Sequence, residues 1–558
     1  MFRKRILSLL ILLLFVLTAC ELLVQPTEPV VITETKATTA IVPEPSQVAP
    51  TMTSTQDPIR IYFDPALPEE LTNGYLVTIM GEYAGEKEVS QMILGFEPEF
   101  LMSELVFALV APFKTVTDSV SFNDFDSFWK NGGNFPANEL ILSVESKTAL
   151  ESVLGPAGGG IRTLKEEDIT NFLNLNNGVW AVVPFTEISS TNKVIAIDGV
   201  SPLQKSFNPS IYSLIVPIGL SKLEGASTAQ ADLEEIIREF QAVLPKSNHD
   251  PEKLTTIVLT GVTALARATA KEMELNGVLS PAVSVGELMR EADIAHVSNE
   301  VPFAEDCPPP QWVQEKGLVF CSDVKYIDLM REIGTDVVEL TGDHFADWGP
   351  EAMYLTLEMY RNEGWEYYGG GWDIDEAKEP LRIEHNGNKI AFLGCNAKAP
   401  GYATASATVP GALHCDMDDM ASRVLELRAE GYMVIVTFQH QEIYRWDPTE
   451  QMISDSRRIA DAGATIVSGS QAHQPHIYEF YGDTFIHYGL GNLFFDQLGW
   501  FDDSNKAFLD RHVFYDGKYL GVELITAQFF NWSTPTLMTP EARAEMLGRL
   551  FEYSQMSE

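Results

Sequence analysis

The stretch TDVVELTGDHFADWGPEAMYLTLEMYRNEG, residues 335–364, decides the fold class. A short apolar run, VVEL, is followed by a polar cluster with Asp343, His344 and Asp347, and then by a segment of helical character. Strand, polar loop and helix in this order form the repeating unit of α/β proteins. The stretch therefore predicts a buried strand with chemically useful side chains at its end.

The same unit recurs on both sides of this stretch. Apolar strand cores of four to six residues occur in TTIVLT, ADIAHVSNE, NKIAFLG, YMVIVTFQH, ATIVSG and TFIHYGLGNLFF, with helical segments such as MASRVLELRAEG between them. Short apolar cores that each end in a polar cluster are typical of a sheet buried on both faces. We expect an α/β domain over residues 252–535.

A second α/β pattern precedes this domain. IRIYFD, GYLVTIM, LILSVES, GVWAVVPF and KVIAIDG have strand character, and TLKEEDITNFLNL has helix character. The proline-containing, charged stretch at 243–254 separates the two patterns and indicates a domain boundary. We therefore expect a first α/β domain over residues 58–245.

The N-terminus has the composition of an export signal. Three basic residues precede an apolar stretch, which ends in LTAC at Cys20. LTAC resembles the bacterial lipobox, and this resemblance implies that Cys20 receives a lipid and becomes the mature N-terminus. Residues 1–20 are thus predicted to be a lipoprotein signal peptide, and the Thr- and Pro-rich residues 21–57 a disordered tether. An extracytoplasmic protein, anchored by lipid to a bacterial membrane, is expected.

The net charge and the cysteine count indicate which partners and which cellular compartment are compatible with the sequence. The net charge of −41 should repel nucleic acid, so nucleic acid is excluded as a partner. Apart from Cys20 there are four cysteines, and an even number in an exported chain favours disulfides. Pairing Cys307 with Cys321 and Cys395 with Cys415 closes the shortest loops, whereas a zinc site of four thiolates remains the rival interpretation.

Metal-capable side chains follow several predicted strands. Carboxylates and imidazoles together suit divalent transition metals, because both are good donors at neutral pH. Because these groups each follow a buried strand, we expect them to meet at one edge of the sheet. They are Asn299 and Glu300, Asp343 and His344, His440 and Glu442, and His473.

The motifs that hold these residues resemble the CapA-type poly-gamma-glutamate capsule proteins, over residues 252 to about 530. SNEVPF, TGDH, QHQEIY, GSQAHQPH and HYGLGNLFFD resemble the family's NLET, NNH, HWGxEY, GHHPH and YSLGNFVFD elements, in the same order. The resemblance implies a calcineurin-like metallophosphoesterase fold, in which sheets form a sandwich flanked by helices. Separately, VAPFKTVTDSVSFNDFDSFW and GVWAVVPFTEI in the first domain resemble periplasmic solute-binding proteins of the phosphate and molybdate type.

By this resemblance the metal ligands are Glu300, Asp343, His440 and His473, and His344 is the catalytic acid. The chain departs from the family pattern in two places. Val262 stands where the family has a ligating Asp, and Gln471 replaces a His. Asn299, Glu442 and Asn492 are the other motif residues. Losing a carboxylate and an imidazole should weaken at least one position of a two-metal site.

Two functions follow from these observations. The first is a surface lipoprotein that synthesises, exports or anchors poly-gamma-glutamate or a related capsule polymer, with metal-assisted hydrolysis or transfer. The alternative is a non-catalytic lipoprotein that binds a polymer or small-molecule ligand and keeps a degenerate metal site. The metal could be Mn, Zn or Fe, or could be absent. Measuring bound metal separates the two.

Overall fold

The structure is a computed structural model that describes residues 59–556, apart from 69–70, 72–81, 84, 226–229, 314–316, 399–400 and 402. The predicted signal peptide with Cys20, the predicted tether at 21–57 and the whole of the predicted strand GYLVTIM lie outside the described residues. Residues 58–558 form one compact unit. Within the described residues, no helix has both the length and the apolar character needed to cross a bilayer.

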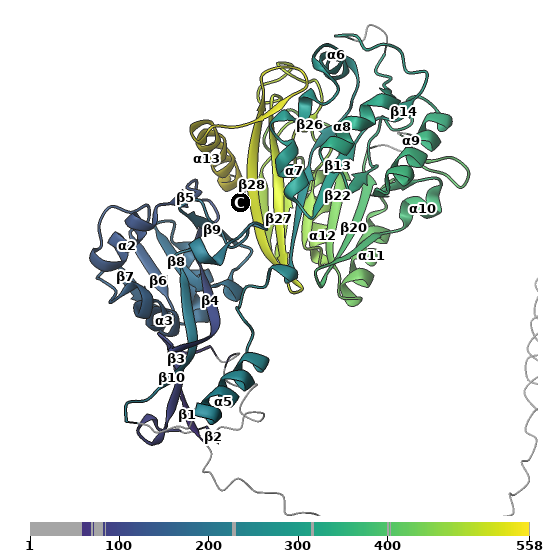
Figure 1. The fold of residues 1–558 in the computed structure, drawn as a ribbon. Helices are drawn as coiled ribbons and strands as arrows, with labels where there is room; N and C mark the ends of the chain where they lie inside the picture. The colour runs from purple at the N-terminus through teal and green to yellow at the C-terminus, as the bar shows by residue number, and fades with distance from the viewer. Residues whose placement is uncertain are drawn as a thin grey trace, which may run out of the picture. The chain divides into compact units, whose positions relative to one another are not determined.

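The first part of this unit is a mixed sheet in the order β2-β1-β3-β10-β4-β8-β6-β7, in which β9 also pairs with β4, and β5 pairs with β9 (Figure 1). Helices pack against it around large buried side chains such as Trp129 and Trp180. The strands are β1 (Arg60–Phe63), β2 (Glu82–Tyr83), β3 (Met92–Phe96), β4 (Phe100–Pro112), β5 (Ser119–Val120), β6 (Glu139–Leu142), β7 (Ile161–Thr163), β8 (Val179–Pro184), β9 (Asn192–Ile197) and β10 (Ile215–Lys222). The helices are α2 (Phe122–Asn131), α3 (Val144–Leu154), α4 (Glu166–Leu175) and α5 (Gln230–Val243).

The remainder contains two larger sheets. One has the order β17-β16-β13-β11-β27-β28-β29, in which β12 also pairs with β13, and β26 pairs with β12. The other has the order β19-β20-β22-β23-β25-β24. The strands of the first are β11 (Leu254–Thr260), β12 (Val262–Thr263), β13 (Ile294–Asn299), β16 (Val337–Glu339), β17 (Glu366–Tyr368), β26 (Asn492–Phe494), β27 (Lys506–Tyr515), β28 (Lys518–Phe529) and β29 (Pro535–Leu537). Those of the second are β19 (Leu381–His385), β20 (Asn388–Asn396), β22 (Met433–Gln439), β23 (Ile466–Ser468), β24 (Tyr478–Tyr481) and β25 (Thr484–His487).

Short paired strands and helices complete this region. The strands are β14 (Phe303–Ala304) with β15 (Ser322–Asp323), and β18 (Gly370–Gly371) with β21 (Gly411–Ala412). The helices are α6 (Arg267–Asn276), α7 (Gly286–Glu291), α8 (Ile327–Glu332), α9 (Pro350–Glu363), α10 (Ile374–Lys378), α11 (Met417–Ala429), α12 (Glu450–Asp461) and α13 (Pro540–Met556).

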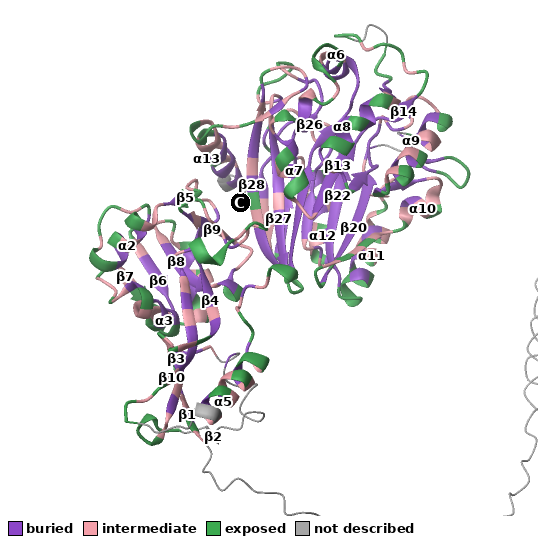
Figure 2. Ribbon diagram, viewed as in Figure 1, coloured by how far each residue is buried: buried purple, intermediate pink, exposed green. Residues whose placement is uncertain are grey.

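The two larger sheets pack against each other and are covered by helices on their outer faces. Ile257 of β11 and Phe392 of β20 belong to one shared core, while side chains of α8 and α9 pack with the opposite face of the first sheet. Every residue of β11, β13 and β22 is buried, as Figure 2 shows for the sheet centres. Burial on both faces explains why these strands have near-continuous apolar sequences. The predicted α/β class, with a sandwich flanked by helices, is confirmed.

Both predicted disulfides form. Cys307 bonds to Cys321, and Cys395 bonds to Cys415, closing loops of 14 and 20 residues in sequence separation. The predicted local pairing is therefore confirmed, and the four thiols cannot form a zinc site. Cys395 is in β20, so its disulfide ties the end of this central strand to the segment that precedes α11.

Candidate metal centre

The polar side chains singled out in the sequence lie where parallel strands of both sheets end. Glu300 follows β13, Asp343 and His344 follow β16, and Glu442 follows β22. β13 pairs with β16 in parallel, so their ends lie at the same edge. Gly342 lets the two loops approach, since a Cβ there would lie only 2.7 Å from Glu300 Cα.

Glu300 is the centre of this cluster. Its carboxylate can be grouped with Asp343 and His344, or with Glu442 and His473, with the ligand atoms of each group within 4.8 Å of one another. Glu300 is completely buried, and neither carboxylate oxygen has a hydrogen-bond partner among the described residues. The pKa of Glu300 is raised to about 8: burial raises it most, the charge of His344 opposes this effect, and the charges of Asp343 and Glu442 add to it.

His473 presents an unprotonated nitrogen to Glu300. Its Nδ1 lies 2.9 Å from Oδ1 of Asn492, whose amide nitrogen lies 3.4 Å from the His473 carbonyl oxygen. This orientation makes the Asn492 oxygen the acceptor, so Nδ1 carries the proton and Nε2 has a lone pair. Nε2 lies 3.8 Å from Oε1 of Glu300. Two electron-rich groups that face each other in a buried pocket fit a cation between them.

His344 is fixed by a carboxylate on its other side. Its Nδ1 donates to Oδ2 of Asp347 over 2.7 Å, and its ring packs against Phe320. Burial alone would lower the pKa of His344, but the hydrogen bond to Asp347 and the charges of Glu300 and Asp343 raise it to about 9. At neutral pH this imidazole is therefore protonated in the absence of a bound cation, as a general acid must be.

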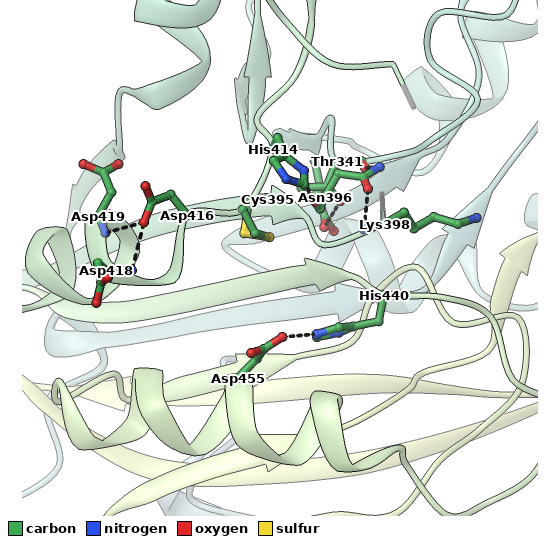
Figure 3. Close-up of a disulfide and its surroundings, with 12 residues drawn as sticks. Thr341, Cys395, Asn396, Lys398, His414, Asp416, Asp418, Asp419, His440 and Asp455 are labelled. Carbon is green, nitrogen blue, oxygen red and sulfur yellow. Dashed lines mark hydrogen bonds and ion pairs between the residues drawn. A yellow bond between two sulfur atoms is a disulfide. The ribbon is translucent and has the colours of Figure 1, made fainter. Parts of the chain in front are cut away.

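A lysine that the sequence analysis did not single out lies among these groups. The Lys398 ammonium is buried, 2.6 Å from Oδ2 of Asp343 and 2.5 Å from Oε1 of Glu442. Figure 3 shows Lys398 extending from the loop after Asn396, at the end of β20. Burial opposes ionisation of Asp343, but His344 and Lys398 outweigh burial and lower the pKa of this carboxyl below its ordinary value.

His440 lies apart from the cluster. Its Nε2 contacts Oδ2 of Asp455 in α12 over 3.1 Å, as Figure 3 shows, and it is in neither group around Glu300. The structure thus brings Asp343 and His473 next to Glu300, but it does not bring His440 to them. His476 is also outside both groups, with Nε2 at 3.4 Å from the carbonyl oxygen of Ile443.

The remaining motif residues make hydrogen bonds next to the pocket. Asn299 donates to the carbonyl oxygen of Val301 and to the Tyr360 hydroxyl, both at 2.7 Å. Gln471 donates to the Ser298 hydroxyl. Val262, at the position of the missing carboxylate, is completely buried. These contacts use the amide nitrogens of Asn299 and Gln471, while their side-chain oxygens are buried without a hydrogen-bond partner among the described residues.

A divalent cation fits these residues. The unpartnered, buried carboxylate of Glu300 and the Nε2 lone pair of His473 are both suitable donors, and the remaining carboxylates add negative charge. The signal that could have identified Lys398 in the sequence is its place: NKIAFLGCNAK is another apolar strand followed by polar residues. Polar residues that follow such a run are expected at the same edge of the sheet, so this position makes Lys398 a candidate residue of the pocket.

Comparison with known proteins agrees with the motif resemblance. Residues 256–497 match the family model described as "Bacterial capsule synthesis protein PGA_cap". The chain is 22% identical over 313 residues to the capsule biosynthesis protein CapA of Bacillus anthracis (55% of this chain, 74% of the relative). It is 26% identical over 282 residues to the PGA biosynthesis protein CapA of Bacillus subtilis strain 168 (50% and 72%). The C-terminal half is thus related to CapA proteins, as its motifs predict.

Solved structures that resemble the chain fall into two groups. A 5'-nucleotidase precursor from Thermus thermophilus covers 55% of this chain and 59% of its own, with 14% identity and a TM-score of 0.32. An ABC-type phosphate transport receptor from Vibrio cholerae covers 33% of this chain and 93% of its own, with 14% identity and a TM-score of 0.27.

Proposed function

We propose that this chain, whose C-terminal half is related to CapA proteins, acts in the synthesis, export or anchoring of poly-gamma-glutamate or a related surface polymer. We further propose metal-assisted hydrolysis or transfer at the Glu300 pocket. The observation that carries the proposal is the convergence of the family's motifs on one buried, unpartnered carboxylate. A purely structural domain would have no reason to keep such a costly group.

The residues of the pocket divide the chemistry among them. Glu300 and His473, with Glu442, would hold the ion. A bound divalent ion would polarise a carbonyl or phosphoryl oxygen of the substrate. His344 holds a proton on its imidazole, oriented by Asp347, and can donate it to a leaving group.

The N-terminal sequence is the basis for the proposed location at a membrane. We expect lipidation at Cys20 to hold the protein on the outer side of a bacterial membrane, with residues 21–57 as the tether. In a bacterial host, Cys20→Ser should move the protein from the membrane fraction to the soluble exported fraction. If the Cys20→Ser protein remained in the membrane fraction, the anchor would be wrong while the rest of the proposal would stand.

A ligand-binding protein without catalysis is the second candidate. Val262 and Gln471, which replace two metal-binding residues of the family pattern, favour it. In this case the pocket would bind an ion or a ligand without turning over a substrate. The enzyme requires both bound metal and turnover, whereas the binding protein has no turnover and need not hold metal, so both quantities must be measured on the same preparation.

The test uses the full chain, purified in detergent and dialysed against Mn²⁺. Bound metal is measured together with hydrolysis of a phosphodiester and of a gamma-glutamyl peptide. We expect Glu300→Gln to lose metal and turnover, and His344→Asn to keep metal and lose turnover. Glu305→Gln, an exposed carboxylate nearby, is the matched control. Bound metal without turnover in the wild type would select the binding protein.

A further inference from the structure

The two ligand groups of the pocket share Glu300 and differ in their second carboxylate. One contains Asp343 and the other contains Glu442. The ammonium of Lys398 contacts both of these carboxylates, at 2.6 Å and 2.5 Å. It therefore lies between the second carboxylates of the two groups.

We propose that Lys398 is a built-in cation, which takes the place of a second divalent ion and limits the pocket to one. This inference rests on the proposed metal-binding function of the pocket. Two cations a few ångströms apart repel strongly in a buried site, so an ion that used both Asp343 and Glu442 would have to displace the ammonium. An ion at Glu300 and His473 need not displace it.

The surrounding contacts hold Lys398 in this position. Its backbone nitrogen donates to Oδ1 of Asn396 over 2.9 Å, and the Asn396 side chain donates to the Thr341 carbonyl oxygen over 2.9 Å. The Gln439 amide donates to Asp343 and Glu442, at 3.2 Å and 3.3 Å, from the side of β22. The same two carboxylates are thus fixed by an amide and an ammonium.

The charge of the pocket supports the proposal that Lys398 takes the place of a second divalent ion. Asp343, Glu442 and ionised Glu300 are three buried or half-buried carboxylates close to one another, and Lys398 offsets one negative charge. The protonated His344 is offset by the carboxylate of its own partner, Asp347. One divalent ion would offset the other two. A second divalent ion in addition to Lys398 would leave an excess of positive charge, which a low-dielectric site does not favour.

The test counts ions. The full chain in detergent is dialysed against Mn²⁺, and manganese per chain is measured by mass spectrometry. We expect Lys398→Gln to bind one equivalent more than the wild type and to gain more thermal stability from Mn²⁺. Lys389→Gln, at the other end of β20 and exposed, should match the wild type. An unchanged stoichiometry in Lys398→Gln would overturn the proposal.

Removing the ammonium leaves two carboxylates facing each other, so the variant could fail to fold without metal. In that case Lys398→His, which offers an imidazole to the same carboxylates, is purified in Mn²⁺. It must also bind one equivalent of Mn²⁺ more than the wild type. Absence of the gain also overturns the proposal. If the wild-type protein bound no Mn²⁺, the proposed catalysis would be refuted. The number of Mn²⁺ ions bound by the Lys398 variants, compared with the wild type, would still decide this inference.

Discussion

A buried carboxylate without a hydrogen-bond partner is costly, and Glu300 is such a group among the described residues. The structure brings to it a histidine lone pair and two carboxylates from different strands. Together they form a concentrated negative charge that a cation would stabilise, because opposite charges attract strongly where water is excluded.

At the residue scale, Asn492 controls how His473 binds an ion. Its side-chain oxygen accepts the Nδ1 proton and thereby leaves Nε2 free to act as a ligand. We expect Asn492→Ala to weaken Mn²⁺ binding by roughly 10–100-fold, because groups that orient a ligating histidine have effects of this size. Isothermal titration calorimetry measures the change. Asn492→Asp keeps an acceptor and should bind more tightly than Asn492→Ala; equal affinities would contradict the assigned role.

A second residue-scale prediction concerns His512 in β27. Burial lowers the pKa of His512 to about 4, against the opposing charge of Asp510, and Nδ1 lies 2.9 Å from the Tyr519 hydroxyl oxygen. Since the pKa in the unfolded chain is about 6.5, the unfolded state binds the proton more tightly. Stability is therefore fully present above about pH 6.5 and is lost as the pH falls toward 4.

The difference is measured by urea unfolding at about pH 7 and about pH 5, on either side of the unfolded-state pKa. We expect His512→Gln to reduce the loss of unfolding free energy between these values by on the order of 1–2 kcal/mol. His296 and His476, whose pKa values are also lowered by burial, should preserve part of the pH dependence. If the variant lost as much stability as the wild type, His512 would not titrate in this range.

Most of the residues around the pocket could be predicted from the sequence, and Lys398 shows why the rest could not. Glu300, Asp343, His344 and His473 follow strands whose apolar runs are unmistakable, and they carry groups associated with metals. Lysine is not a metal ligand in its charged form, so a search for donors passes over it. Its position after β20 places it at the same edge of the sheet, but its partners are carboxylates in the loops after β16 and β22, and only the fold shows that these three side chains meet.

At the element scale, the apolar runs predicted the central strands well. The runs at β11, β13, β20 and β22 are buried on both faces, where sequence and burial agree most closely. The hairpin β27–β28 and helix α13 were not assigned as elements. Their burial depends on contacts with distant segments, such as the pairing of β27 with β11, and those contacts cannot be inferred from neighbouring residues.

The disulfide at the end of β20 gives an element-scale prediction. Cys395–Cys415 closes a loop of 20 residues in sequence separation, and this loop contains Asn396 and Lys398. We expect the double variant Cys395→Ala, Cys415→Ala to lose about 3 kcal/mol of unfolding free energy, because the crosslink restricts the unfolded chain. Urea unfolding measures the loss.

Reduction supplies the control for this disulfide. Dithiothreitol should lower the stability of the wild type through both disulfides and that of the double variant through Cys307–Cys321 alone. The two proteins should then unfold at the same urea concentration. If the midpoint urea concentrations of the two proteins still differed under reduction, the substitutions themselves, and not the missing crosslink, would cause the loss of stability.

At the scale of the whole molecule, the first sheet is joined to the sandwich by side chains from both. Phe113, directly after β4, packs against Tyr478, Phe480 and Phe485 at ring distances of 5.0, 4.9 and 6.0 Å. Arg543 of α13 donates to Asp118 over 2.9 Å. These contacts place residues of the N-terminal sheet and of the sandwich in one core, so their unfolding should be coupled.

Substituting Phe113 tests this coupling. We expect Phe113→Ala to lower the unfolding free energy by about 3 kcal/mol, because the cavity left by a buried ring lies between the two parts. Calorimetry should also show a broader transition or two separate ones, since the parts no longer share this ring. Phe530→Ala, at a ring that is 73% exposed, should leave the transition unchanged. A single, sharp and equally displaced transition in Phe113→Ala would indicate that other contacts, such as Asp118 with Arg543, couple the parts instead.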